Sequence, residues 1–305
     1  MSAKKFLVKI CVMAIFTLAT GFVQPRIGVN AYHGTYADKG VTYMSVQPEL
    51  TAELTQDDLY KDILAEVSTP LNNNTPNRRG NIILTCEKIN ETVLMPRDTF
   101  SFNQIVGNRT EDLGFKPAPT FMDGKIVDSV GGGICQVSST LYYACLLSDL
   151  EIAHREGHSM CPDYIEKPGL DATVSWGAID YKFKNSTDNP IKILVWVEGT
   201  TVYVKLMGTK TNSNTVEMET EVLSTTPYET IYRDNPNLAP GETKVIQPHF
   251  TGYVCETYRV IKNESGNVIS RTLESKNTYR KLDEIIERGP QSTLENSLQI
   301  TPDTK

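Results

Sequence analysis

The chain has 305 residues and a mass of 34.0 kDa, enough for one large domain or two domains of ordinary size. Hydrophobic residues make up 39% of it and charged residues 22%, with 20 glycines and 16 prolines. This composition excludes collagen-like, coiled-coil and wholly disordered proteins. The net charge of −7 argues against nucleic acid or another anionic polymer as the main partner.

The first 31 residues have the pattern of a secretory signal peptide. Three lysines precede a mostly apolar stretch over residues 10–23, and a small-x-small pattern follows at residues 29–31. The stretch is short for a spanning helix, which needs about 20 apolar residues, so an uncleaved anchor is the alternative. Residues 1–31 contain four basic residues and no acidic one, so their removal takes the net charge from −7 to −11. We therefore expect an exported protein whose contact with a membrane is limited to such an anchor.

Cysteine usage predicts at least one free thiol. Removal of the signal peptide leaves an odd number of cysteines, which are Cys86, Cys135, Cys145, Cys161 and Cys255. Cys145 is expected in the core, and Cys161 is expected as a loop thiol or as a disulfide partner of Cys255. The sequence has neither a CxxC pair nor the His/Cys spacing of a zinc site, so no bound metal is predicted.

The pattern of elements predicts an α+β domain followed by an all-β domain. Residues 32–69 are polar and are interpreted as a spacer with a short helix over 57–66. Helical spacing of apolar residues predicts helices over 81–89 and 134–147. Strands of the first domain are expected at 92–95, 99–102, 152–156, 172–175, 181–184, 191–197 and 201–206, with an Asp-Gly hairpin at 121–126. Strands of the second domain are expected at 215–223, 244–247, 253–261 and 268–273, with a turn at 263–266.

These elements place the domain boundaries. The first domain is predicted at 70–207, mostly antiparallel strands on which a glycine loop and a helix pack, and the second is a small all-β surface domain at 208–289. Residues 290–305 are polar and are expected to be a disordered tail.

The run GGGICQVSSTLYYA at residues 131–144 is the candidate for chemistry. Its glycines lead into a helix that begins near Cys135. A helix N-terminus has unpaired N–H groups and a positive dipole end, which lower the pKa of a thiol and can bind an oxyanion. A base is available from His154 or His158, with His158 favoured because Gly157 frees its backbone, and Asp171 is a candidate to orient that base. Together these residues predict a cysteine acyltransferase or hydrolase.

A purely structural interpretation of the same residues stands beside this one. Free cysteine is among the most buried residue types, so Cys135 is equally well a packing residue, although bulk packing does not require three consecutive glycines. Ser138 and Ser139 are rival nucleophiles whose place in the first helical turns favours capping or packing. Arg109 is either a carboxylate clamp or an ordinary surface arginine.

The chain resembles the VanW family, which is named from vancomycin-resistance clusters and found in cell-envelope proteins of Gram-positive bacteria. The resemblance covers about residues 70–207. Besides the glycine–cysteine run, it rests on Asn77–Ile82, Phe100–Asn103, Val106–Thr110, His158–Ser159, Gly169–Val174 and Asp180–Asn185. The run is long enough to be highly specific.

The C-terminal region resembles the small β domains, named for their glycines, that accompany VanW domains on bacterial surfaces. The matching segments are Pro227–Thr230, Leu238–Gly241, Thr257–Val260 and Ile285–Gly289. The region departs from the pattern around His249–Cys255, where glycines are fewer.

The family resemblance implies a peptidoglycan setting and, for some members, L,D-transpeptidase activity. It implies that Cys135 is the nucleophile that forms a thioester with a stem peptide, that His158 is the general base and acid, and that Asp171 holds it. The candidate substrate-binding residues are Gly132, Gly133, Ser138, Ser139, Arg109 and Tyr164. The partners implied are peptidoglycan stem peptides, with glycan as a further ligand class, and the chemistry needs no cofactor or metal. The alternatives are a carboxypeptidase, in which water replaces the acceptor amine, and a noncatalytic peptidoglycan-binding or glycopeptide-resistance accessory protein.

Overall fold

The computed structural model describes residues 29–35, 42–48, 59–122 and 125–290. The predicted signal peptide and the predicted tail lie almost wholly outside these ranges. The chain divides into two units, residues 1–58 and 59–305. In the first unit, β1 (Val29–Thr35) pairs antiparallel with β2 (Thr42–Pro48). No helix in the described ranges is long and apolar enough to cross a membrane.

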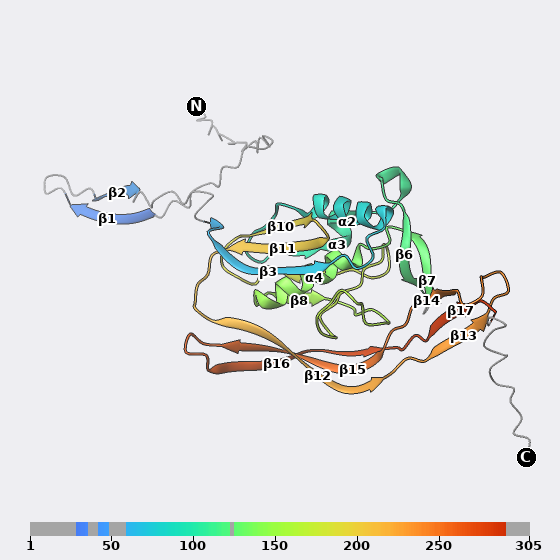
Figure 1. Ribbon diagram of the computed structural model, residues 1–305. Coiled ribbons are helices and arrows are strands. Elements are labelled where there is room, and N and C mark those ends of the chain that lie inside the picture. Colours follow the sequence, from blue (N-terminus) through green and yellow to red (C-terminus); the bar gives the residue numbers. More distant parts are fainter. Residues whose placement is uncertain (1–28, 36–41, 49–58, 123–124, 291–305) are drawn as a thin grey trace, which may run out of the picture. The chain divides into compact units, whose positions relative to one another are not determined.

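The second unit is built on a four-stranded antiparallel sheet with strand order β3-β11-β10-β4 (Figure 1). Its strands are β3 (Asp62–Pro70), β4 (Thr92–Leu94), β10 (Ile191–Glu198) and β11 (Thr201–Gly208). Buried residues alternate along β10 and β11, so one face of the sheet is apolar. That face shares a continuous core with α2 (Pro76–Ile89) and α4 (Cys135–Leu147).

Smaller elements surround this sheet. A second antiparallel sheet has the order β5-β9-β8, and β6 pairs with β7 in a hairpin. The bounds are β5 (Thr99–Ser101), α3 (Phe102–Val106), the 3-10 helix η1 (Glu111–Leu113), β6 (Pro117–Met122), β7 (Lys125–Val130), β8 (Glu151–His154) and β9 (Lys182–Lys184). The hairpin register pairs Met122 with Lys125, as the Asp-Gly pattern predicts, although residues 123–124 themselves lie outside the described ranges.

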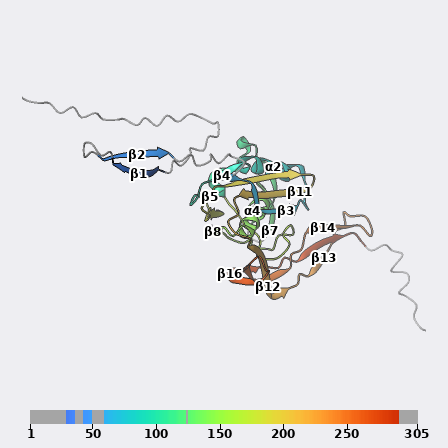
Figure 2. The ribbon, with the colours of Figure 1, turned by 90° about the vertical axis from the view of Figure 1, so that its left-hand side faces the viewer.

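The C-terminal region is all β and contains two three-stranded sheets. The first has the order β12-β15-β16 and the second β13-β17-β14, in which β13 and β17 are parallel. The bounds are β12 (Thr215–Thr226), β13 (Thr230–Asp234), β14 (Thr243–Gln247), β15 (Gly252–Lys262), β16 (Val268–Tyr279) and β17 (Glu284–Arg288). In both views the first sheet runs beneath the layer that holds α4, and β12 contacts that helix (Figures 1 and 2). The described chain is thus mostly antiparallel sheet with few helices, broadly as the α+β class predicts.

Three local expectations were wrong. The helix predicted over 57–66 is absent from 62–66, because Ala65, Val67 and Thr69 are buried with exposed residues between them, a two-residue period that makes β3 a strand. Residues 62–69 therefore belong to the central sheet and not to a polar spacer. The strand expected at 172–175 makes only the isolated bridges Glu156–Thr173 and Ser175–Ile179, since the chain turns back on itself there.

Candidate active site

The glycine run brings the start of α4 close to two other segments. Gly131 and Gly133 have φ angles of 85° and 101°, which a side chain would strain. Gly132 lies so close to β6 that an added β-carbon would lie 2.1 Å from the carbonyl oxygen of Ala118. An added β-carbon at Gly133 would lie 2.6 Å from Cγ of Arg78. The three glycines thus set the direction in which α4 begins, with Cys135 as its first residue.

The thiol of Cys135 is half-buried and lies in a polar setting. Its sulfur lies 3.5 Å from the carbonyl oxygen of Val174 and 3.7 Å from Oγ1 of Thr173. Among the described residues no acceptor pairs with the backbone N–H of Cys135, as expected for the first turn of a helix.

His158 and Asp171 are bound together beside this thiol. The His158 ring donates from Nδ1 to Oδ2 of Asp171 at 2.6 Å, and the backbone N–H of His158 donates to the same oxygen at 2.7 Å. Both side chains are buried, that of Asp171 completely. Since Nδ1 faces the carboxylate, Nε2 is the ring nitrogen left for the hydrogen bond with Cys135. The structure thus brings together the three residues that the sequence singled out.

Burial and pairing act in opposite directions on these groups. Burial works to raise the pKa of the Cys135 thiol, but the hydrogen bond and the positive charge of His158 outweigh it, and the net shift is downward. Burial disfavours the charged imidazole too, yet the bonds to Asp171 and Cys135 raise the pKa of His158 to about 9. Burial works against ionised Asp171, while the bond to His158 and the neighbouring charges lower its pKa to about 2. The directions of the three shifts favour ionisation of Cys135 and Asp171 and protonation of His158.

The other described cysteines have the opposite character. Burial raises the pKa of Cys86 to about 12 and that of Cys161 to about 12, and it raises those of Cys145 and Cys255 as well. All of them are free thiols, so the alternative of a Cys161–Cys255 disulfide is not realised. Within the described chain, Cys135 alone combines a histidine partner with a lowered pKa.

Two residues that the sequence reasoning missed complete the surroundings of Asp171. Arg155 donates from Nε to the backbone oxygen of Asp171 at 2.6 Å and from Nη2 to its Oδ1 at 2.9 Å. The hydroxyl of Tyr279, from β16, donates to Oδ1 at 2.5 Å. A sequence signal for Arg155 was its place between the two candidate histidines. Tyr279 had none, because it lies 108 residues away in the other domain.

His154, the less favoured candidate base, has other surroundings. His154 is at the end of β8, with about half of its side chain exposed, and its Nε2 lies 3.6 Å from Glu156. The geometry therefore favours His158 over His154 as the partner of Cys135.

Arg109 carries an unpaired charge near the thiol. Its three guanidinium nitrogens are buried and have no hydrogen-bond partner in the part of the chain that the structure describes. The guanidinium carbon lies 5.7 Å from the ring centre of Phe102 and 5.8 Å from that of Trp176. Burial lowers the pKa of Arg109, while the negative charge of Cys135 opposes that shift, so the two groups are close enough for their charges to interact. A buried, unsatisfied guanidinium suits a carboxylate ligand.

Ser138 and Ser139 join α4 to the segment that carries Asp171. Both hydroxyls donate to the backbone oxygens of Cys135 and Ala172, and Ser139 accepts from the N–H of Ala172 at 3.0 Å. The hydroxyls are buried and satisfied by the protein, so their observed contacts are structural. Ser139 also lies 3.4 Å from the hydroxyl of Tyr164.

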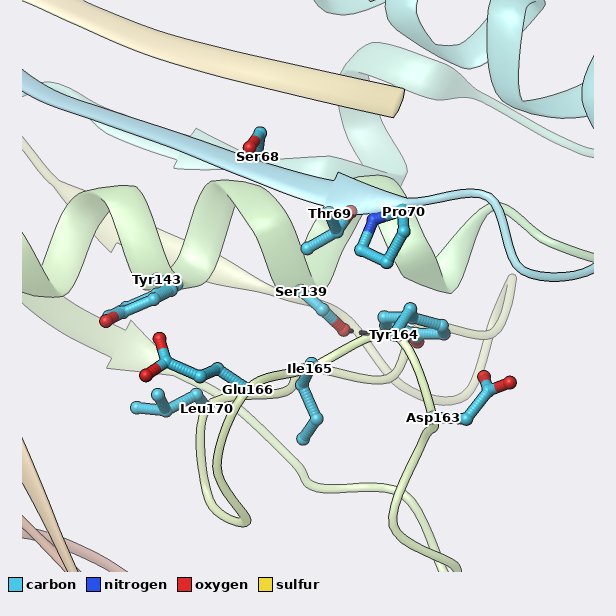
Figure 3. Close-up of a pocket in the computed structure, with 10 residues that line it drawn as sticks. All are labelled: Ser68, Thr69, Pro70, Ser139, Tyr143, Asp163, Tyr164, Ile165, Glu166 and Leu170. Atoms are coloured by element: carbon cyan, nitrogen blue, oxygen red, sulfur yellow. Dashed lines mark hydrogen bonds between the residues drawn. The ribbon is translucent and has the colours of Figure 1, made fainter. Parts of the chain in front are cut away.

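Ser139 and Tyr164 line a pocket of about 220 Å³ one helical turn from Cys135. It lies between the end of β3, the exposed side of α4 and the segment 163–170 (Figure 3). Figure 3 shows Tyr143 and Glu166 at one end and Asp163 at the other, with Ser139 and Tyr164 meeting between them. Ser139 and Tyr143, both in the glycine–cysteine run, line this pocket together with Tyr164.

No metal site accompanies these residues. In the ranges that the structure covers, no group of three or more His, Cys, Asp or Glu side chains is arranged to hold a metal ion.

Comparison with known families and proteins identifies both domains. The model of VanW-like proteins matches residues 77–207, and the G5 domain model matches residues 214–291. Uncharacterized protein YoaR of Bacillus subtilis is 38% identical over 183 residues, which is 56% of this chain and 60% of the relative. Vancomycin B-type resistance protein VanW of Enterococcus faecalis is 35% identical over 126 residues, 40% of this chain and 46% of the relative. The chain thus spans less than two thirds of either relative.

Two solved structures of G5 domains match part of the chain. The HP0197-G5 crystal structure matches with 18% identity and a TM-score of 0.15, covering 25% of this chain and 97% of that one. The IgA1 protease G5 domain matches with 22% identity and a TM-score of 0.17, covering 28% of this chain and 100% of that one. By the two family models, the chain combines a VanW-like domain over residues 77–207 with a C-terminal G5 domain over residues 214–291.

Proposed function

We propose that the protein is an exported, cysteine-dependent acyltransferase of the cell envelope, and that it is an L,D-transpeptidase acting on peptidoglycan stem peptides. The observation that carries this proposal is the arrangement of Cys135, His158 and Asp171 at the start of α4. A thiolate beside an oriented imidazolium is the arrangement of groups that covalent acyl transfer uses. The peptidoglycan setting is taken from the two domain families and from a relative named for vancomycin resistance.

The reaction begins at the donor stem. The Cys135 thiolate attacks the carbonyl carbon of the third residue, a diamino acid, and forms a tetrahedral oxyanion. We assign stabilisation of that oxyanion to the backbone N–H of Cys135, at the positive end of α4. His158 then gives its proton to the departing nitrogen, and D-alanine leaves as a thioester remains on Cys135.

The second half uses the same groups in reverse. Neutral His158 takes a proton from the side-chain amine of a neighbouring stem as that amine attacks the thioester. The thioester C–S bond breaks, the thiolate is regenerated, and a cross-link between two diamino acids is the product. Water in place of the amine would release a free acid, which is the carboxypeptidase outcome.

The surroundings of Arg109 support a donor stem peptide whose terminal carboxylate is free. In the described part of the chain its buried guanidinium has no hydrogen-bond partner, and its charge interacts with those of Cys135 and Asp180. The leaving residue of a tetrapeptide stem ends in a carboxylate, which pairs well with a guanidinium in a site shielded from water. We assign Arg109 to that carboxylate, and the Ser139–Tyr164 pocket to part of a peptide chain.

The test is a product assay with the mature chain, residues 32–305, and purified tetrapeptide muropeptides. Mass spectrometry of the protein and of the products is expected to show a thioester on Cys135, loss of D-alanine and cross-linked dimers. Cys135→Ala is expected to give none of these, while the matched variant Cys161→Ala retains them.

Two outcomes would contradict the proposal. Binding of muropeptides without turnover by the unaltered chain would make it a wall-binding module, the noncatalytic alternative. Turnover that persists in Cys135→Ala would show that another group is the nucleophile.

A further inference from the structure

We propose that the G5 domain is part of the catalytic centre, because its Tyr279 is a positioning residue for the carboxylate that orients His158. This inference rests on the proposed function, and it adds a role for the C-terminal domain beyond attachment to the wall. It places the site across two domains of one folded unit, residues 59–305.

The Asp171 carboxylate accepts hydrogen bonds from both domains. Oδ2 accepts both hydrogen bonds from His158, and Oδ1 accepts from Arg155 and from the hydroxyl of Tyr279. The Tyr279 hydroxyl in turn accepts from the backbone N–H of Gly169 at 2.8 Å. Tyr279 is only 3% exposed, so water does not readily replace its hydroxyl. Rotation of the carboxylate away from His158 would break bonds to both domains.

A second G5 residue holds the other partner of Asp171. Asn277, two residues before Tyr279 on β16, accepts from Nη1 of Arg155 at 2.5 Å. The amide nitrogen of Asn277 donates to Ser275, which fixes the orientation of the amide. Arg155 also lies over the ring of Tyr142 at 5.1 Å. The guanidinium that faces Asp171 is therefore fixed from the G5 side as well as from α4.

The loop that carries His158 and Asp171 is in close contact with the G5 sheet near both of its ends. The N–H of Arg280 donates to Ser159 at 2.7 Å, and Thr220 donates to Pro168 at 3.0 Å. Gly169 has a φ of 95°, and an added β-carbon there would lie 2.0 Å from the hydroxyl of Thr257. Such close approach is characteristic of a formed interface, and not of two domains joined only by a linker.

The hydroxyl of Tyr279 acts on the charge of Asp171. A donor to an ionised carboxylate stabilises the charged form, and Tyr279 is one cause of the low pKa of Asp171. The titratable groups that face Asp171 are His158, Arg155, Tyr279, Tyr142, Tyr164, Cys161 and Cys255. Without the hydroxyl, the carboxylate can turn away from His158, which weakens the imidazolium that lowers the pKa of Cys135. Acid therefore protonates the thiolate at a higher pH, and this protonation sets the acid limb of its reactivity.

The experiment measures the rate at which iodoacetamide alkylates Cys135 in the full mature chain between pH 3.5 and 9, resolved by site with mass spectrometry. In Tyr279→Phe the acid limb of the profile is expected to move upward by about half a pH unit, which is about a threefold lower rate at a fixed pH on that limb. The matched control is Tyr258→Phe, whose hydroxyl bonds Glu256 on β15. We expect the control to follow the unaltered chain.

A Tyr279→Phe profile that superimposes on that of the unaltered chain would overturn the inference. If Tyr279→Phe does not fold, Asn277→Ala takes its place, with an upward shift of the same limb as the supporting result and no shift as the contrary one. The assay needs no muropeptide, so its outcome is separable from that of the proposed function. An unreactive Cys135 in the unaltered chain would contradict the acyltransferase itself, whereas a reactive Cys135 without the shift would contradict only the role of Tyr279.

Discussion

The first and third turns of α4 each contain a cysteine, and the two thiols lie in opposite surroundings. Cys135 opens the helix beside a glycine loop, a histidine and polar atoms of the segment 173–174, and its pKa is lowered. Cys145, ten residues later, is completely buried in the apolar core, and its pKa is raised. The chemical identity of the residue therefore says little about its role.

What separates the two positions is the state of the backbone and the partner. In the third turn, N–H groups are paired within the helix, and the neighbours of Cys145 are core side chains such as Leu141 and Leu146. At the first residue no described acceptor pairs with the N–H, and the protonated form of His158 is favoured beside it. The N-terminus of α4 has a buried imidazole beside it because a separate loop brings His158 there.

The largest expected effect is a difference in muropeptide turnover between variants of the two cysteines. Cys135→Ala is expected to lower acyl transfer by at least about 10³-fold, because no neighbouring group replaces a covalent nucleophile. Cys145→Ala is expected to retain most of the activity. Rates of muropeptide turnover at equal protein concentration check both, and a Cys145→Ala variant as inactive as Cys135→Ala would break the comparison.

The role of His158 as the base for Cys135 is tested by a pair of histidine variants. His158→Ala is expected to reduce the rate of thioester formation by about 10²–10⁴-fold, since it removes the proton carrier and the charge that favours the thiolate. His154→Ala, at the exposed end of β8, is expected to stay near the unaltered rate. Single-turnover mass spectrometry gives both rates, and the reverse ranking would refute the assignment.

The requirement for glycine in the loop before α4 is tested by the free energy of unfolding. Gly133→Ala forces a β-carbon into a φ of 101° and against Arg78, so it is expected to lower the free energy of unfolding by about 1–3 kcal/mol. Gly80 lies in α2, and an added β-carbon there meets nothing within 4 Å. Gly80→Ala is therefore expected to raise stability by about 0.5–1 kcal/mol. Urea denaturation of the two variants measures these changes, and equal effects would show that the loop is not strained by a side chain.

The smallest expected effect concerns the buried thiol. Cys145→Ala removes one sulfur from a close-packed core and is expected to lower the free energy of unfolding by about 1 kcal/mol. Cys135→Ala, at a half-buried site, is expected to change it less. Thermal unfolding of the two variants, followed by circular dichroism, compares them directly. A greater loss for Cys135→Ala would indicate that the first turn is also a packing site.

Much of the site could be predicted from local sequence. The three glycines before a helical pattern located Cys135, and residue type with a nearby glycine favoured His158. Local pattern also located β10 and β11, whose alternation is regular. Where the pattern was short or mixed, as in β3, polarity on the exposed face concealed a core strand.

The long-range part of the site could not be predicted from local sequence. Tyr279 is one of 14 tyrosines, and only the packing of the G5 sheet against the segment 155–171 brings its hydroxyl to Asp171. The unpaired state of Arg109 was equally hidden, because burial of its nitrogens depends on Phe102 and Trp176 folding over it. Spacing identifies residues capable of chemistry, and tertiary packing decides which of them meet.

One measurement tests the central claim most directly, which is that Cys135 is an activated thiolate while the other cysteines are not. The folded mature chain is treated briefly with iodoacetamide at pH 6, where an ordinary thiol of pKa about 8.5 is less than about 1% ionised. Peptide mass spectrometry then gives the extent of modification at each cysteine. We expect fast modification of Cys135, its loss in His158→Ala, and almost none at Cys86, Cys145, Cys161 or Cys255. A Cys135 that reacts no faster than these four would contradict the account.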